Sequence, residues 1–419
     1  MDQRLRRDVA WNLIPVVLLA IVGLGMNFLI ARWWSADALG IFNLVTIAYF
    51  VFTVAGAFGL QFSVLRAVAE HADDPDRVAA IVVGALVPGV AITAVATCLF
   101  VLLRGPIAAL HGSDAVGEGM LWATPGLFCF ALNKILFGVV NGLRRMRAFA
   151  VYTSLRYLLI GTGLIIAHAF RVKAEHLTVI WTFTEGTLLL VMLGELVINV
   201  RLRRCAGWTR WTREHLTYGA RGVTATLAQE INSKLDVWML GAAGVAKHLV
   251  GVYSMSAALN EGAMQLSAVV QYNLNPMIAR SIAARRPTEV DELARRTRRW
   301  FVPAMAGACL LGALAYPVVV PRLVGDPTFS QGTIPFAVLM AGVALASPYL
   351  VFNQLLMMAK MPGWHTVFLL LVAGINFVAN LTLIPRLGIT GAAASTSIAI
   401  VGSAVLLHRL ARGRVGVRI

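Results

Sequence analysis

Twelve apolar stretches, each long enough to cross a bilayer as a helix, fill almost the whole chain. The hydrocarbon core is about 30 Å thick and needs about 20 apolar residues of helix. With 58% hydrophobic and only 13% charged residues, the chain has more apolar surface than a water-soluble core could hide. The sequence therefore predicts an all-α polytopic membrane protein with about twelve transmembrane helices. The stretches cover residues 10–31, 38–65, 78–103, 119–142, 148–170, 178–200, 218–243, 249–278, 300–322, 332–359, 363–385 and 388–410.

The basic residues predict the orientation of the chain in the membrane. If the N-terminus is cytoplasmic, the segments on the inner side hold 25 of the 36 Lys and Arg residues, and those on the outer side hold seven. Cytoplasmic segments of membrane proteins are enriched in Lys and Arg. We therefore expect both termini to be cytoplasmic, and the net charge of +16 is explained without nucleic acid as a partner.

A weak internal similarity predicts two halves. Residues 39–43 (LGIFN) and 250–254 (VGVYS) follow the first and the seventh apolar stretch, 211 residues apart. Residues 145–149 and 360–364 match at an offset of 215. Six spans return the chain to the side on which it started, so such halves would have the same orientation. We expect a six-helix lobe over residues 1–200, a basic linker over 201–217 and a second six-helix lobe over 218–419. A central cavity and alternating access would follow from this architecture.

Nine charged side chains fall inside the predicted spans. Each costs roughly 2.5–3.5 kcal/mol at the centre of the bilayer, so they are expected to pair with one another or to line a wet cavity. They are Lys134, Arg156, Glu185, Glu195, Arg221, Glu230, Lys234, Asp236 and Glu261.

The seventh stretch carries most of these groups. At 100° per residue, four polar side chains lie within about 80° of one another and define a polar helix face. They are Arg221, Gln229, Asn232 and Asp236. Glu230 and Lys234 lie on the opposite side, four residues apart and in the favourable order.

We interpret these residues as the lining of a substrate cavity. Arg221, Lys134, Lys234 and Arg156 are the candidate cations for an anionic substrate group. The candidate polar residues for the cavity and for ion coupling are Asp236, Glu261, Glu230, Gln229 and Asn232. The alternative interpretation is structural, with Glu230–Lys234 as a buried pair and Arg156–Glu195 as a bridge between helices.

No feature of the sequence predicts an enzyme. Neither a catalytic constellation nor a phosphate-binding glycine-rich loop is found, and the four cysteines have no metal-binding spacing. We expect no cofactor other than a coupling ion, H⁺ or Na⁺.

Three segments carry a family resemblance. They are residues 380–397 (NLTLIPRLGITGAAASTS), 236–241 (DVWMLG) and 250–257 (VGVYSMSA). In the first, Pro385 ends one span and Gly388 permits a tight turn. This segment is similar to the end of the polysaccharide (O-antigen type) flippases of the multidrug/oligosaccharidyl-lipid/polysaccharide exporter superfamily. The other two resemble the family's aspartate-bearing seventh span and the beginning of its eighth.

The resemblance implies a flippase in the bacterial cytoplasmic membrane. It would carry an undecaprenyl-diphosphate-linked oligosaccharide across by alternating access, for surface polysaccharide biosynthesis. Its partners would be this lipid-linked glycan, membrane lipids, a polysaccharide polymerase and other pathway proteins.

Two alternatives stay open. A cation-coupled multidrug exporter of the same superfamily commonly uses a carboxylate in the first span, where this chain offers only Asn12 and Asn27. A membrane-embedded glycan polymerase or ligase generally needs a large outer loop, which the sequence does not predict.

Overall fold

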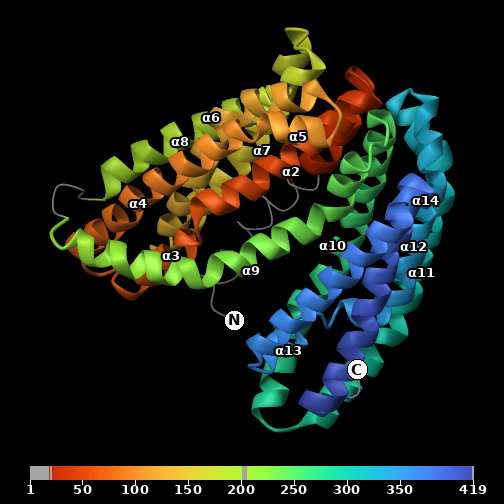
Figure 1. Ribbon diagram of the computed structural model, residues 1–419. Helices are drawn as coiled ribbons and strands as arrows, with labels where there is room; N and C mark the ends of the chain where they lie inside the picture. The colour runs from red at the N-terminus through yellow and green to blue at the C-terminus, as the bar shows by residue number, and fades with distance from the viewer. Residues whose placement is uncertain (1–17, 19–20, 201–204, 418–419) are drawn as a thin grey trace. The chain divides into compact units, whose positions relative to one another are not determined.

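The computed structural model describes residues 18, 21–200 and 205–417, and these residues form helices and short connections without a strand (Figure 1). The chain divides into two compact units. Unit 1 comprises Met1–Met26 and Ile41–Ser233, and unit 2 comprises Asn27–Gly40 and Lys234–Ile419. The predicted all-α class is confirmed. The predicted domain boundaries at residues 200 and 218 stay a prediction.

Unit 1 is built around one long central helix. Helix α6 packs against α3, α4 and α8, as the orange and yellow helices in Figure 1 show. Its core is formed by fully buried aliphatic side chains such as Leu60, Ile81, Ile135 and Leu188. The helices of this unit are the C-terminal part of α2 (Ala36–Ala57), α3 (Leu60–Glu70), α4 (Pro75–Leu102), α5 (Arg104–Leu110), α6 (Asp114–Gly142), α7 (Met146–Ala169), η1 (Ala174–His176), α8 (Val179–Asn199) and most of α9 (Trp208–Ala242).

A break divides the second predicted span, which the sequence analysis treats as one stretch over residues 38–65. Phe58 and Gly59 adopt left-handed backbone conformations with φ of 49° and 71°, so α2 ends at Ala57 and α3 begins at Leu60. Helix α9 packs closely against this break. A Cβ atom on Gly219 would lie 2.3 Å from the carbonyl oxygen of Phe58. The break therefore allows α9 to pack closely at the beginning of α3.

Unit 2 is built around α12, which packs against α10, α11 and α14. Figure 1 shows these as the green to blue helices. The helices of this unit are the end of α9, α10 (Lys247–Ala283), α11 (Pro287–Val324), η2 (Pro327–Gly332), α12 (Thr333–Leu350), α13 (Leu355–Met358), α14 (Pro362–Leu410) and η3 (Ala411–Val415).

Helix α14 contains the turn that the proline–glycine motif predicts. Gly388 has a non-helical backbone, with φ of 55° and ψ of −130°, and separates the last two predicted spans. A Cβ atom on Gly391 would lie 2.2 Å from the carbonyl oxygen of Leu383. Only glycine at position 391 therefore permits the chain after the turn to pass so close to Leu383.

The predicted spans have counterparts among these helices. In the described part of the chain, eight helices are long and apolar enough to cross a membrane, and the last of them spans two predicted stretches. Helices α9 and α10 match the seventh and eighth stretches but carry more polar residues. A shorter apolar helix, Ile21–Trp33, matches the first stretch, whose beginning lies outside the described residues.

The two glycines of the weak internal similarity meet inside unit 2. A Cβ atom on Gly40 would lie 2.2 Å from the carbonyl oxygen of Lys247, and one on Gly251 would lie 2.0 Å from that of Ala36. Ala36 and Lys247 are related by the same offset of 211 residues as the glycines. The contact is therefore reciprocal, and the predicted parallel repeat stays a prediction.

Candidate functional site

The polar groups buried within unit 1 centre on Glu185. This carboxylate pairs with Arg156, Nη2 to Oε2 at 2.8 Å, and accepts a hydrogen bond from Asn133 Nδ2 at 2.9 Å. The Arg156 guanidinium also lies 4.2 Å from the centre of the Phe130 ring. Asn133 and Phe130 are on α6, Arg156 on α7 and Glu185 on α8, so the cluster ties three helices together.

The predicted bridge between Arg156 and Glu195 is wrong. Glu195 instead pairs with Arg145, Nη1 to Oε1 at 2.9 Å, and accepts a hydrogen bond from Tyr152. Glu185 and Glu195 lie ten residues apart on α8, which is nearly three helical turns. Arg156 therefore pairs with Glu185, the glutamate at its own level along the helices.

Lys134 lies beside this cluster and is half-buried. Its Nζ is 5.0 Å from the centre of the Phe130 ring, and it interacts electrostatically with Glu230 on α9 and with Glu185. The structure therefore brings together two residues that the sequence analysis assigned to the cavity, Lys134 and Glu230.

Unit 2 holds a second buried carboxylate, Asp236. Its Oδ2 accepts hydrogen bonds from Tyr253 on α10 and, at 3.2 Å, from Thr396 on α14. Its Oδ1 accepts from the backbone N–H of Val237 at 2.9 Å. Asp236 is therefore held by two neighbouring helices, α10 and α14, and is almost inaccessible, with 7% of its surface exposed.

Lys234 forms an ion pair with Glu261, which joins α9 to α10. The predicted pair between Glu230 and Lys234 stays a prediction, because Glu230 belongs to unit 1 and Lys234 to unit 2. Both members of the Lys234–Glu261 pair are partly exposed, with 32% and 50% of their side chains accessible.

The other predicted residues of α9 are placed as follows. Arg221 is exposed and belongs to unit 1, whereas Asp236 belongs to unit 2, so the shared polar face stays a prediction. Asn232 has a buried Oδ1 with no hydrogen-bond partner in the described part of the chain. The side chain of Gln229 lies outside what the structure describes.

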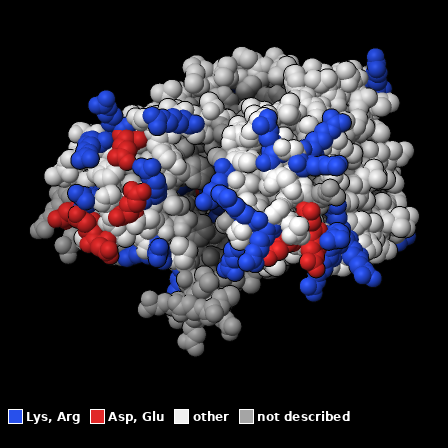
Figure 2. All heavy atoms as spheres, turned by 90° about the horizontal axis from the view of Figure 1, so that it is seen from below, with Lys and Arg blue, Asp and Glu red and all other residues white. Residues whose placement is uncertain are grey.

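Arg221 lines a pocket at the start of α9, which we call the basic pocket. Its volume is about 350 Å³, and its lining comes from the end of α3 and the first turns of α9. Basic side chains are widespread on the face of the molecule drawn in Figure 2, while acidic ones form small groups. The lining residues are Arg66, Arg210, Arg213, Glu214, Thr217, Tyr218 and Arg221.

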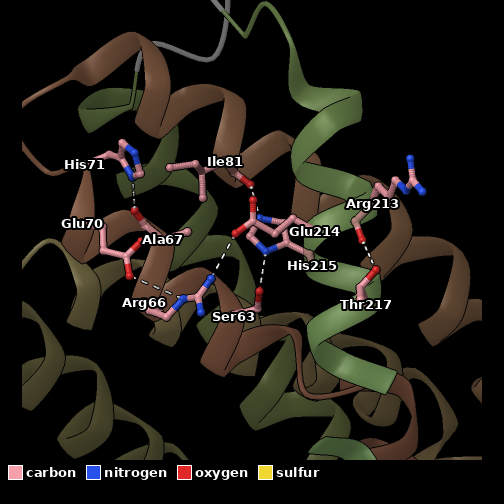
Figure 3. A network of polar contacts seen from close by, with 10 residues as sticks. All are labelled: Ser63, Arg66, Ala67, Glu70, His71, Ile81, Arg213, Glu214, His215 and Thr217. Carbon is pink, nitrogen blue, oxygen red and sulfur yellow. Dashed lines mark hydrogen bonds and ion pairs between the residues drawn. The ribbon is translucent and has the colours of Figure 1, made fainter. Parts of the chain in front are cut away.

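Arg66 is held in place within this pocket (Figure 3). Its Nη2 is 3.0 Å from Glu214 Oε1, and its Nε is 3.6 Å from Glu70 Oε1. Its guanidinium also lies 5.2 Å from the centre of the Tyr218 ring. Arg66, Arg210 and Arg213 are among the 25 inner-side Lys and Arg residues of the sequence analysis, which did not predict that they share a pocket. The spacing of Arg210, Arg213 and Arg221 along one helix could have indicated a shared face.

His215 fastens the start of α9 to the neighbouring helices, and sequence reasoning missed it (Figure 3). Its Nδ1 is 2.8 Å from Ser63 Oγ on α3, and its Nε2 is 3.1 Å from the backbone oxygen of Ile81 on α4. Because a carbonyl only accepts, Nε2 carries the proton and donates to Ile81, and Nδ1 accepts from Ser63. Burial lowers the pKa of His215, which lies before the seventh predicted span.

A metal centre is not formed by the described residues, since they contain no group of three or more His, Cys, Asp or Glu side chains that could hold an ion. The buried polar groups sit instead as pairs and small networks between helices. Polar groups at this depth in an all-helical protein are typical of transporters.

The fold and these groups define a polytopic membrane protein of the transporter class. The chain belongs to the polysaccharide biosynthesis protein family, whose model matches residues 5–283. It is 20% identical to the probable low-salt glycan biosynthesis flippase Agl15 of Haloferax volcanii over 406 residues, covering 95% of this chain and 82% of that protein. The resemblance to polysaccharide flippases is confirmed at the level of the family.

Two solved structures have a similar fold. An inward-facing multidrug resistance MATE family transporter of the MOP superfamily matches with a TM-score of 0.79 and 12% identity, over 98% of each chain. The lipid II flippase MurJ, in an inward closed conformation, matches with a TM-score of 0.76 and 13% identity, over 95% of this chain and 86% of that chain. The family match and the similarity to a glycan biosynthesis flippase confirm the prediction of a non-enzyme.

Proposed function

We propose that this protein is a flippase for a lipid-linked oligosaccharide. It moves an undecaprenyl-diphosphate-linked glycan from the cytoplasmic to the outer leaflet of the bacterial cytoplasmic membrane, for surface polysaccharide biosynthesis. The observation that carries the proposal is the family match over residues 5–283, together with the similarity to a glycan biosynthesis flippase over nearly the whole chain. Both termini are cytoplasmic in this proposal, and a polysaccharide polymerase uses the product.

The cationic side chains supply the contacts for the diphosphate. Lys134 forms no close ion pair with another described residue, and Arg221 is exposed in the basic pocket. Lys234, which forms an ion pair with Glu261 and has 32% of its side chain exposed, is the third candidate. Arg156 is a weaker candidate, because Glu185 and the Phe130 ring already hold its guanidinium.

Asp236 is the proposed coupling residue, together with Glu261 and Glu230. Ionisable side chains inside membrane spans often mark ion pathways, and Asp236 is buried where three helices meet. In the proposed cycle, Asp236 binds H⁺ or Na⁺, and loss of that ion changes how α9, α10 and α14 are held together.

Deletion of the gene tests the function. Lipid-linked glycans would be extracted from the deletion strain, sorted by membrane leaflet and identified by mass spectrometry. We expect undecaprenyl-diphosphate oligosaccharide to accumulate on the cytoplasmic side and to disappear on complementation. An unchanged glycan distribution combined with increased sensitivity to cationic drugs would contradict the proposal and favour a multidrug exporter.

A further inference from the structure

The basic pocket has more positive charge than its acidic residues can balance. Four arginines and one glutamate line it, and that glutamate, Glu214, already pairs with Arg66. Arg210, Arg213 and Arg221 form no ion pair with any residue of the described part of the chain. Because arginines in close proximity repel one another, such a cluster is stabilised by an anion that lies among them.

Contacts within the protein hold the Arg66 side chain and the first turns of α9 in place without a ligand. The side chain of Arg66 is held from three directions, by Glu214, Glu70 and the Tyr218 ring. The helix that carries the other arginines is fixed as well. His215 bonds to α3 and α4, and Thr212 Oγ1 donates to the backbone oxygen of Gly84 on α4 at 2.9 Å. Little conformational freedom is therefore lost at Arg66 when a ligand binds.

The side chains indicate a phosphate group. A guanidinium matches two phosphate oxygens at once, and arginine clusters are a common way to bind phosphate. A volume of about 350 Å³ lies at the lower end of the range for small-molecule sites, which suits a headgroup with one or two phosphates.

The position of the pocket along the chain indicates that the phosphate belongs to a lipid. The pocket lies at the beginning of the seventh predicted span, and Trp208 and Trp211 are in the same first turns of α9. Tryptophan favours the headgroup level of a bilayer. The positive-inside pattern places this end of α9 at the cytoplasmic leaflet.

We propose that the basic pocket binds the phosphate or diphosphate of a lipid headgroup at the cytoplasmic surface of unit 1. Two lipids carry this chemistry, an anionic phospholipid and the diphosphate-linked glycan carrier. The pocket shares Arg221 with the proposed function, but it is tested by binding and not by export, so the two proposals can fail separately.

The test is lipid binding to the purified full-length protein, followed by native mass spectrometry in detergent. The probes are phosphatidylglycerol, undecaprenyl diphosphate and the zwitterionic phosphatidylcholine. We expect one of the two anionic lipids to bind well above phosphatidylcholine, and the stronger of them identifies the source of the phosphate. The double variant Arg213→Gln/Arg221→Gln should bind that lipid at least about tenfold more weakly, since each lost phosphate contact is charge-assisted.

Two further variants separate a specific site from general charge. Arg295→Gln/Arg296→Gln removes the same charge from exposed positions on α11 and should leave the affinity within about threefold. Glu214→Gln removes the acidic group of the lining and should strengthen binding of the anionic lipid, whereas a purely structural role of Glu214 would weaken it. Equal loss of binding in both arginine double variants, or wild-type protein that binds the three lipids alike, would overturn the proposal.

Discussion

At the scale of single residues, His215 shows how a titratable group can hold an element in place without taking part in transport. Its ring is buried and neutral, donates to the backbone of α4 and accepts from Ser63 on α3. Desolvation by burial lowers the pKa of His215 below 6.5 and outweighs the hydrogen bond to Ile81 and the charge of Glu214, which both raise it. Burial of His215 therefore costs free energy only when the ring is protonated.

Acid should destabilise the protein through this residue. Because the folded-state pKa of His215 lies below its unfolded value of 6.5, its contribution to stability is fully present above pH 6.5 and is lost as pH falls through the folded pKa. We expect the melting temperature in detergent to fall between pH 7 and pH 5. The variant His215→Gln should show a smaller fall over the same range. An identical pH dependence of the two proteins would contradict this assignment.

At the scale of elements, close backbone contacts at glycines decide how the helices cross. The contact of Gly40 with Lys247 and of Gly251 with Ala36 brings the start of α2 against the start of α10. Small residues permit such approaches between membrane helices, and packing of this kind replaces the hydrophobic effect as the source of helix association. The contact is reciprocal, because each helix contributes one glycine and one backbone carbonyl oxygen.

Gly251→Ala should destabilise unit 2. The new methyl group would lie 2.0 Å from the carbonyl oxygen of Ala36, and a backbone cannot give way as a flexible side chain does. We expect a loss of about 1–3 kcal/mol, as for other overpacked sites. The matched control is Gly374→Ala on α14, where a Cβ atom meets nothing within 4 Å. That change should stabilise the helix by roughly 0.5–1 kcal/mol. Thermal unfolding in detergent measures both, and equal melting temperatures would contradict the argument.

At the scale of the whole molecule, transport requires charges that are available to a substrate rather than used by neighbouring helices. Lys134 is the half-buried cation that we propose for this role. Its Nζ lies 5.0 Å from the centre of the Phe130 ring, beside the Arg156–Glu185 pair, and it forms no close ion pair with another described residue. Arg145, in contrast, already pairs with Glu195.

Lys134→Ala should abolish export while the protein remains in the membrane at normal levels. Complementation of the deletion strain, read out as surface glycan, measures the effect, and immunoblotting of the membrane fraction measures the protein level. We expect export to fall at least about tenfold, since a lost charge-assisted contact to a desolvated phosphate costs roughly 1.5–3 kcal/mol. Arg77→Ala removes an exposed cation at the start of α4 and is the control. Full export by Lys134→Ala would remove this residue from the proposed cavity.

The sequence alone determined the class of the protein, the position of its spans and the turn at Gly388, because these depend on local properties. A bilayer requires about 20 apolar residues per helix, and a glycine such as Gly388 can adopt the left-handed backbone that ends a helix. Only the tertiary structure decided which charges meet. Arg156 pairs with Glu185 and Lys234 with Glu261, and the basic pocket joins α3 to α9. These partners are distant in the sequence, and which carboxylate a cation reaches depends on the depth and rotation of packed helices, which hydropathy does not encode.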